Sequence, residues 1–186
     1  DHGSGRNHLR HLRTAAQARG MNGDIETEGC TIKLQENFLC ACGRTHRAQV
    51  KSVVTGAGAL QRVPTIAAQL GGRRCFVLAD ERTHRAAGEA VCAALDNSRI
   101  PYTEYVLPGN TVKPDEKTVG AAVMHFDRRC DLVIGVGSGV INDVGKLLSK
   151  TAGTPYIIVG TVPSMDGYAS ATSLMDVDGL KVSLPS

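Results

Sequence analysis

The sequence contains no tryptophan, few other aromatic residues and no long apolar run. Phe and Tyr make up 4% of its 186 residues, and the net charge is +3. So small a charge and so few aromatic side chains do not indicate a nucleic-acid partner. No run approaches the roughly 20 apolar residues that span a bilayer, and no apolar core of a signal peptide is visible. These absences predict a cytoplasmic protein that binds neither nucleic acid nor membrane.

The six cysteines contain no C-x2-C pair, and they are spread along the chain. This distribution predicts reduced thiols rather than the dense disulfide framework of a small secreted domain. Four soft ligands near the N-terminus are close enough in sequence for a tetrahedral zinc site: Cys30, Cys40, Cys42 and His46. The C-x-C spacing also fits one face of a hairpin strand turned at Gly43. We favour the hairpin over zinc because the usual knuckle spacing is missing.

From residue 49 onward, strand-like and helix-like segments alternate. Strand patterns cover 50–55, 74–80, 102–108, 132–137 and 156–161, and helical patterns cover 57–72, 82–98, 113–129 and 140–153. Five strands separated by helices predict an α/β fold, a Rossmann-like parallel sheet with helices on both faces. Around Asp178 and Gly179 the pattern changes to the alternation of a β-hairpin.

A glycine-rich turn follows the fourth predicted strand and opens a helix. Gly137, Ser138 and Gly139 allow a backbone to approach a phosphate closely, and the helix that follows offers unpaired N–H groups with a positive dipole end. Asp143 and Lys146 stand three residues apart on that helix and can pair on one face. The structural alternative for this pair is a surface salt bridge that contributes under about 1 kcal/mol.

Polar residues also follow the second and fifth predicted strands. Asp80 ends the second strand, where a dinucleotide-binding fold places the acid that contacts ribose hydroxyls. Its structural alternative is an N-cap of the next helix. If Asp80 contacts ribose, its carboxylate disfavours a 2′-phosphate and favours NAD over NADP. The segment 161–172 carries short polar side chains on a Pro/Gly-bent loop at the sheet edge where open α/β sheets bind ligands.

Two of these segments carry a resemblance to a known family. "GVGSGVINDVGK" followed by "GTVPSMDGYASA" resembles the iron-containing alcohol dehydrogenase and dehydroquinate synthase superfamily, most closely its sn-glycerol-1-phosphate dehydrogenases of the AraM-like type. The resemblance covers roughly residues 38–186. It implies a dehydrogenase that uses NAD or NADP and a divalent metal, Zn or Ni, to interconvert dihydroxyacetone phosphate and sn-glycerol 1-phosphate, acting as a homodimer.

The resemblance also implies roles for individual residues. Asp80 would hold the adenosine ribose, and Asp166 would contact the substrate beside the nicotinamide. The pyrophosphate and nearby ribose would lie on the glycine-rich segment, which comprises Gly137, Ser138, Gly139, Val140, Ile141, Asn142 and Asp143. The nicotinamide side would be lined by Thr161, Val162, Pro163, Ser164 and Ser170.

The family holds its metal with one Asp and two His that, by this resemblance, lie beyond Ser186. We therefore expect a cofactor-binding half that lacks the catalytic metal ligands and is inactive alone. The expected organisation is a flexible extension over 1–29, a Cys/His hairpin over 30–48, an NAD(P)-binding α/β domain over 49–163, and a substrate-side loop and hairpin over 164–186 leading to a helical metal-binding domain. Three alternatives stay open: a glycerol dehydrogenase, a dehydroquinate synthase-like cyclase, and a non-enzymatic nucleotide-binding module.

Overall fold

A computed structural model describes residues 24–27, 30–33, 37–39, 41–43, 45–47, 50–109, 111–165 and 167–186. The chain divides into two compact units, Asp1–Ala59 and Leu60–Ser186. Within the first unit, β1 (Asp24–Thr27) pairs antiparallel with β2 (Cys30–Lys33) and parallel with β5 (Ser52–Thr55). The predicted hairpin is present as β3 (Asn37–Leu39) and β4 (Thr45–Arg47), with Gly43 in the turn at φ +79°. Of the extension expected over 1–29, only β1 lies among the described residues.

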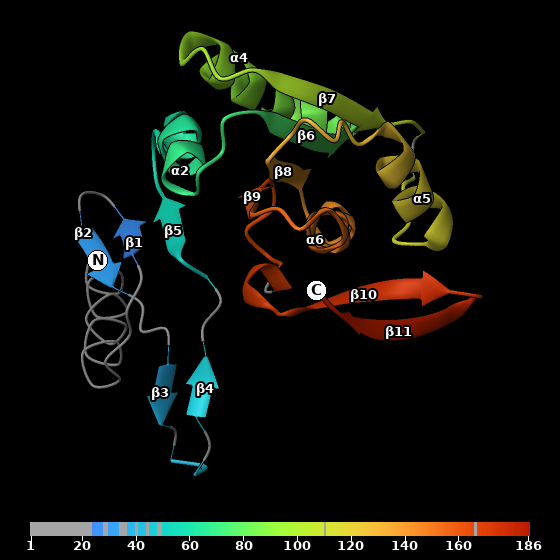
Figure 1. Cartoon of the computed structure of the whole chain (residues 1–186). Helices are drawn as coiled ribbons and strands as arrows, with labels where there is room; N and C mark the ends of the chain where they lie inside the picture. Colours follow the sequence, from blue (N-terminus) through green and yellow to red (C-terminus); the bar gives the residue numbers. More distant parts are fainter. Residues whose placement is uncertain are drawn as a thin grey trace, which may run out of the picture. The chain divides into compact units, whose positions relative to one another are not determined.

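The second unit is built on a four-stranded parallel sheet of order β7-β6-β8-β9 (Figure 1). Its strands are β6 (Cys75–Asp80), β7 (Tyr102–Leu107), β8 (Leu132–Gly137) and β9 (Tyr156–Gly160). Every residue of β6 and β8 is buried, as expected for central strands that are covered on both faces. The predicted parallel α/β sheet is therefore confirmed. One expectation was wrong: the first of the five predicted strands, β5, pairs with β1 instead of joining this sheet.

Helices cover both faces of the sheet. One face packs on α2 (Val63–Gln69), which η1 (Ala59–Arg62) precedes, and on α4 (Glu89–Asn97). The other face packs on α5 (Glu116–His125) and α6 (Gly139–Ala152). In Figure 1, α4 and α6 accordingly lie on opposite sides of the strands. The helix predicted over 82–98 consists of α3 (Glu81–Thr83), a π-helical turn η2 (His84–Gly88) and α4.

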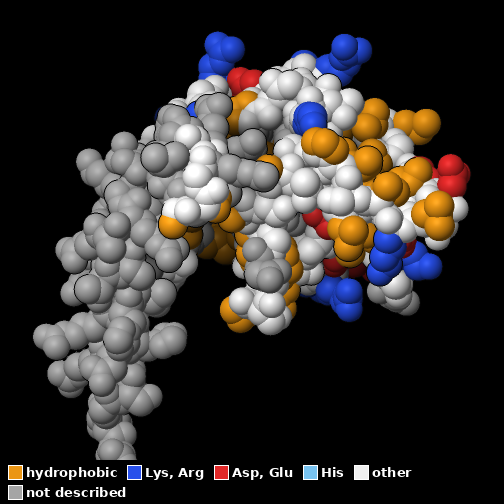
Figure 2. Space-filling view, turned by 90° about the horizontal axis from the view of Figure 1, so that it is seen from below, with side chains coloured by type: hydrophobic (Ala, Val, Ile, Leu, Met, Phe, Trp, Pro, Cys, Tyr) orange, Lys and Arg blue, Asp and Glu red, His pale blue; other side chains and the backbone are white. Residues whose placement is uncertain are grey.

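After β9 the chain forms η3 (Gly167–Ala169) and then the predicted hairpin, β10 (Thr172–Val177) and β11 (Leu180–Pro185). Asp178 and Gly179 both have positive φ, at 50° and 77°, which is the backbone geometry of a type I′ turn. Met175 is buried, whereas Leu174, Leu180 and Val182 are exposed. Figure 2, seen from the side of this hairpin, shows hydrophobic side chains grouped on the surface.

No helix in the described part of the chain is both long enough and apolar enough to cross a membrane.

Candidate functional site at the carboxyl edge of the sheet

The topology of the sheet places a switch point between the carboxyl ends of β6 and β8, the position at which open α/β sheets form a ligand-binding crevice. These two strands are neighbours, and Ala79 lies beside Val136 in the register. After β6 the chain passes through α4 on one face and returns as β7; after β8 it passes through α6 on the other face and returns as β9. The two connections diverge from adjacent strand ends. This is the switch point at which open α/β sheets bind ligands.

Asp80 stands at the end of β6, on one side of this crevice, and is 8% exposed. Its Oδ1 accepts hydrogen bonds from the N–H groups of Arg82 and Thr83, both at 2.8 Å. The Thr83 hydroxyl accepts in return from the Asp80 N–H at 3.0 Å, which completes a capping box. The N-cap interpretation of Asp80 is therefore confirmed. Both side-chain bonds end on Oδ1, so among the described residues Oδ2 keeps its capacity to accept from a ligand.

Three glycines in β8 and α6 are required by packing within the protein. A Cβ on Gly137 would lie 2.5 Å from Ile141 Cγ1 in the following helix. A Cβ on Gly135 would overlap the hydroxyl of Tyr156, and one on Gly145 would lie 2.6 Å from the same oxygen. These three glycines allow β8, α6 and Tyr156 to pack closely.

Gly139, at the first position of α6, differs from these glycines because a Cβ built on it would meet no close atom of the described residues. The nearest atom to a Cβ built there is Met165 Cγ, at 3.9 Å. Ser138 is the N-cap residue in an extended conformation, yet its side chain makes no capping hydrogen bond. The first intrahelical bond runs from the Asn142 N–H to the Ser138 carbonyl at 2.8 Å. The first turn of α6 therefore presents backbone N–H groups and the positive end of a 14-residue helix beside the crevice.

Lys146 anchors the segment after β9 to α6. Its Nζ donates to the backbone carbonyls of Ser170 at 3.2 Å and Thr172 at 2.5 Å, and lies 3.5 Å from Asp143 Oδ1. Its side chain is 9% exposed, and that of Asp143 is 19% exposed. The predicted Asp143–Lys146 pair is thus confirmed, but its interpretation as a surface salt bridge is wrong because η3 and β10 cover it.

The burial of Asp143 beneath η3 and β10 shifts the pKa of its carboxyl. Partial burial raises the pKa of its carboxyl above the ordinary value, while the Lys146 ammonium opposes that rise. A hydrogen bond from the Ser173 hydroxyl to the Asp143 carbonyl, at 3.1 Å, also ties the helix to β10. Asp143 therefore joins α6 to the hairpin.

The loop after β9 is held against the glycine-rich turn. The Thr161 N–H donates to the Gly137 carbonyl at 3.0 Å, and the buried Asn142 Nδ2 donates to the Gly167 carbonyl at 3.2 Å. Val162, Pro163, Ser164 and Ser170 lie on the exposed part of this segment. The structure therefore brings the two predicted cofactor loops together, on α6 and after β9. Asp166, predicted to contact the substrate, lies outside the described residues.

Three residues of this site were not singled out by the sequence analysis. The Tyr168 hydroxyl donates to the Val162 carbonyl at 2.9 Å, and its ring packs on Gly160, where a Cβ would lie 2.8 Å from Cζ. Met165 approaches Gly139, and the backbone carbonyl of Thr172 receives the Lys146 ammonium. Gly160 ends β9, but Tyr168 lies eight residues further along the chain, so no local pattern in the sequence signals this packing.

Two groups of residues are candidates for metal ligands. Of the four residues considered as a zinc cluster in the sequence, Cys42 is exposed, and the side chains of Cys30, Cys40 and His46 lie outside the described residues. Elsewhere in the described part of the chain, one group of His, Cys, Asp or Glu side chains has the spacing of metal ligands. It consists of His84, Cys92 and Glu104, and none of these residues belongs to the loops after β8 and β9. The described residues of those loops therefore do not fit a catalytic metal.

Comparison with known proteins gives matches over most of the chain. The family model of the iron-containing alcohol dehydrogenases matches residues 54–186. A glycerol-1-phosphate dehydrogenase (NAD(P)+) of Halalkalibacterium halodurans is 28% identical over 147 residues, which are 77% of this chain and 37% of that protein. One of Thermococcus kodakarensis is 30% identical over 76% of this chain and 40% of its own length. The chain thus spans a little over a third of the length of the curated relatives it matches.

Solved structures show the same fold at lower identity. A 1,3-propanediol oxidoreductase aligns with a TM-score of 0.62 at 18% identity, over 70% of this chain and 40% of that one. A maleylacetate reductase from Agrobacterium tumefaciens aligns with a TM-score of 0.60 at 20% identity, over 72% of this chain and 37% of that one.

Proposed function

Because the chain belongs to the iron-containing alcohol dehydrogenase family, we propose that its carboxyl-edge crevice binds a nicotinamide dinucleotide. The observation that carries this proposal is the pairing of two features at one switch point. Asp80 is the last residue of β6, and its Oδ2 accepts no hydrogen bond from the described residues. Gly139 is the first residue of α6, whose N-terminus has no side-chain cap. A dinucleotide needs an acceptor for ribose hydroxyls and N–H donors for its pyrophosphate.

Each part of the chain has a stated role in this proposal. Asp80 Oδ2 accepts from the adenosine ribose, and the first turn of α6, from Gly139 to Asp143, binds the pyrophosphate and adjoining ribose. Thr161, Val162, Pro163, Ser164 and Ser170 lie against the nicotinamide, with Asp166 toward the substrate. A carboxylate at position 80 repels a 2′-phosphate, so we expect NAD to bind more tightly than NADP.

Hydrogen bonds hold the segment after β9 in a fixed position against α6. Lys146 and Asn142 fix the segment after β9 to α6, so the nicotinamide side and the pyrophosphate side keep one mutual arrangement. The cofactor held there would supply hydride transfer to or from the substrate. The described residues do not include a fitting set of metal ligands at this edge, so the role proposed for this chain is to bind and orient the cofactor.

For the complete reaction we propose interconversion of dihydroxyacetone phosphate and sn-glycerol 1-phosphate by a protein of which this chain is the cofactor-binding part. The relatives with that name support it, at 24–30% identity. The test follows NADH absorbance with the longest polypeptide that the gene encodes. We expect oxidation that requires the phosphate of dihydroxyacetone phosphate and that a chelator abolishes.

The controls separate the neighbouring activities. Equal or faster turnover of unphosphorylated dihydroxyacetone would assign a glycerol dehydrogenase instead. Oxidation of neither ketone, with NADH still bound, would contradict the proposed reaction while leaving the cofactor site intact. Sustained turnover by the 186-residue chain with added metal would contradict the restriction of its role to cofactor binding.

A further inference from the structure

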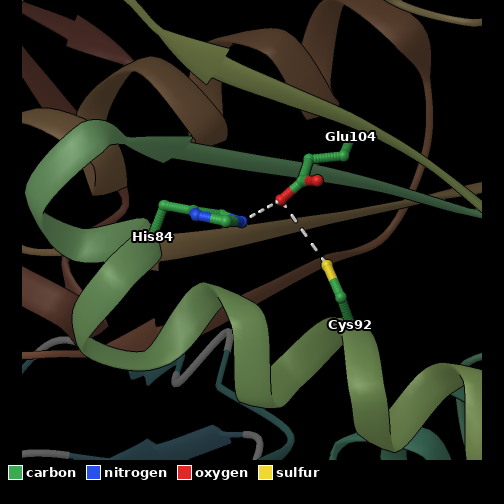
Figure 3. Close-up of side chains that lie close together, drawn as sticks. All are labelled: His84, Cys92 and Glu104. Carbon is green, nitrogen blue, oxygen red and sulfur yellow. Dashed lines mark hydrogen bonds and ion pairs between the residues drawn. The ribbon is translucent and has the colours of Figure 1, made fainter.

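The side of the sheet away from α6 carries a second cluster of reactive side chains, which the proposed cofactor site does not use. His84 comes from the π-helical turn η2, Cys92 from α4 and Glu104 from the edge strand β7 (Figure 3). His84 Nε2 lies 2.5 Å from Glu104 Oε1, and Cys92 Sγ lies 3.6 Å from the same oxygen. The three ligand atoms all lie within 4.8 Å of one another.

From this geometry we propose that His84, Cys92 and Glu104 form a binding site for a zinc ion. Imidazole nitrogen, thiolate sulfur and carboxylate oxygen are the three donors that Zn²⁺ takes in proteins. With a thiolate, a carboxylate and a neutral imidazole, the ligand charges cancel the charge of the ion. Three protein ligands leave one tetrahedral position for water, as in zinc sites that keep an open coordination position.

The distances already approach those of a tetrahedral site. Ordinary zinc–ligand bond lengths place the sulfur and oxygen ligands about 3.6 Å apart and the nitrogen and oxygen ligands about 3.4 Å apart. The Cys92–Glu104 separation meets the first value, and the His84–Glu104 contact must open by about 1 Å to meet the second. The Glu104 side chain is 31% exposed on an edge strand, so it has room for that movement.

The backbone around His84 is shaped to place the imidazole. Residues His84–Gly88 form a π-helical turn, an uncommon conformation that is often found at functional sites. A Cβ on Gly88 would lie 2.7 Å from His84 Cδ2, so glycine at this position lets the ring lie against its own helix. The His84 side chain is 22% exposed and the Glu104 side chain 31%, which gives an ion and a water a path from solvent.

A nucleophilic role for Cys92 is the other chemistry that such a group of residues suggests. Cys92 is only 7% exposed, and cysteines buried in this way are generally inert as nucleophiles. In Figure 3, the thiol and the imidazole each contact Glu104 Oε1, and no hydrogen bond joins the thiol to the imidazole. The geometry therefore favours an ion held between the three groups.

The test must separate this site from the N-terminal cysteines. The parent protein for it is the full chain with Cys30→Ser, Cys40→Ser and Cys42→Ser, which removes the sulfur ligands of that segment. Zn²⁺ is titrated into it against a chromophoric chelator, and Co²⁺ is then used as a spectroscopic probe. We expect one equivalent of zinc, and a cobalt spectrum with a thiolate charge-transfer band and the strong visible bands of tetrahedral geometry.

Single variants in this parent then assign the ligands. Cys92→Ser should abolish the charge-transfer band, and Glu104→Gln, which keeps a hydrogen-bond acceptor on an exposed side chain, should weaken zinc binding at least about tenfold. Cys130→Ser is the matched control, since Cys130 is buried on the other face with its thiol donating to the Cys75 carbonyl at 3.3 Å. It should bind zinc as the parent does.

Two results would overturn the proposal. The first is no zinc binding by the parent, whether or not the wild type binds zinc through its N-terminal cysteines, and the second is zinc binding that Cys92→Ser and Glu104→Gln leave unchanged. If Cys92→Ser fails to fold, as circular dichroism would show, Glu104→Gln and the cobalt spectrum of the parent still decide the outcome.

Discussion

Tyr156 occupies the space that the glycines of β8 and α6 leave open. Its ring passes between Gly135 and Gly145, and its hydroxyl is buried without a hydrogen-bond partner among the described residues. Burial raises the pKa of this phenol well above its ordinary value, and the nearby Asp143 adds to the rise. Gly135 thus belongs to the core, although in the sequence it stands within an apparent phosphate-binding motif.

We expect Tyr156→Phe to be at least as stable as the wild type. The substitution removes a buried hydroxyl that no described residue pairs with, and leaving such a group unsatisfied costs about 1–3 kcal/mol. Tyr102→Phe is the matched control, because the Tyr102 hydroxyl donates to Asp96 Oδ2 at 3.2 Å and its loss should lower stability by about 1 kcal/mol. Urea denaturation of the two variants measures the difference. A Tyr156→Phe protein less stable than Tyr102→Phe would contradict the account of this packing.

One substitution separates the helix cap formed by Asp80 from its proposed contact with ribose. Asparagine is as good an N-cap as aspartate, so Asp80→Asn should keep its free energy of unfolding within about 0.5 kcal/mol. Its amide nitrogen cannot accept from ribose, so we expect the dissociation constant for NADH to rise about tenfold, as for loss of a hydrogen bond to a charged group. Asp80→Ala should lose both the cap and the affinity. NADH fluorescence titration measures the binding, and wild-type affinity in Asp80→Asn would rule out the ribose contact.

The sequence predicted some of these residue roles and missed others for physical reasons. The cap at Asp80 and the Asp143–Lys146 spacing are local patterns, and both are present. That Lys146 is buried could not be inferred locally, because its cover comes from Ser170 and Thr172, more than 20 residues further along the chain. Likewise, nothing near Gly135 in sequence indicates that Tyr156 packs on it.

At the scale of elements, α5 begins at a cap that also touches the hairpin. The Asp115 side chain accepts from the Thr118 N–H at 2.8 Å, and the backbone of Pro114 accepts from the Asp176 N–H at 2.7 Å. This hydrogen bond from Thr118 lowers the pKa of the Asp115 carboxyl below its ordinary value of 3.8. The residue before this cap therefore holds β10 by a backbone hydrogen bond.

This cap should make a pH-dependent contribution to stability. Because the folded pKa is lowered, the contribution of the carboxylate is complete above pH 3.8 and is lost as the pH falls through the folded value. We expect Asp115→Ala to cost about 1 kcal/mol near neutral pH and less in acid. Asp115→Asn should keep a cap of similar strength without the pH dependence. Urea denaturation between about pH 6 and about pH 3 tests this, and a cost that grows in acid would contradict the sign.

The order of elements was largely predictable, whereas their partners were less so. The alternation from residue 49 onward predicted five strands of one parallel sheet, of which four form it, and Asp178-Gly179 predicted the last hairpin. The strand at Ser52–Thr55 was predicted in the same way but pairs with β1. Pairing depends on distant segments, so one-dimensional patterns cannot assign it. The π-helical turn at His84–Gly88 also leaves no mark in the hydrophobic periodicity.

At the scale of the whole molecule, the switch point gathers residues from distant parts of the sequence. Asp80, the first turn of α6 and the loop after Gly160 meet at one edge because β6, β8 and β9 are adjacent and parallel. The fold thus brings three separated polar segments to one edge of the sheet, where we propose that they form one site. The exposed apolar side chains of the hairpin, Leu174, Leu180 and Val182, lie away from the sheet core.

Binding of NADH to the Gly139→Ala variant tests the central claim most directly. Among the described residues, a methyl group at this position meets no atom closer than Met165 Cγ at 3.9 Å, so folding should be unaffected. The methyl would occupy the space through which we propose that the pyrophosphate approaches. Gly120→Ala, on α5 with no atom within 4 Å, is the control with the same change in composition. We predict that wild type and Gly120→Ala bind NADH alike and that Gly139→Ala binds it at least tenfold more weakly, about 1.4 kcal/mol. Equal affinity in all three proteins, or no binding by the wild type, would contradict a cofactor site at this crevice.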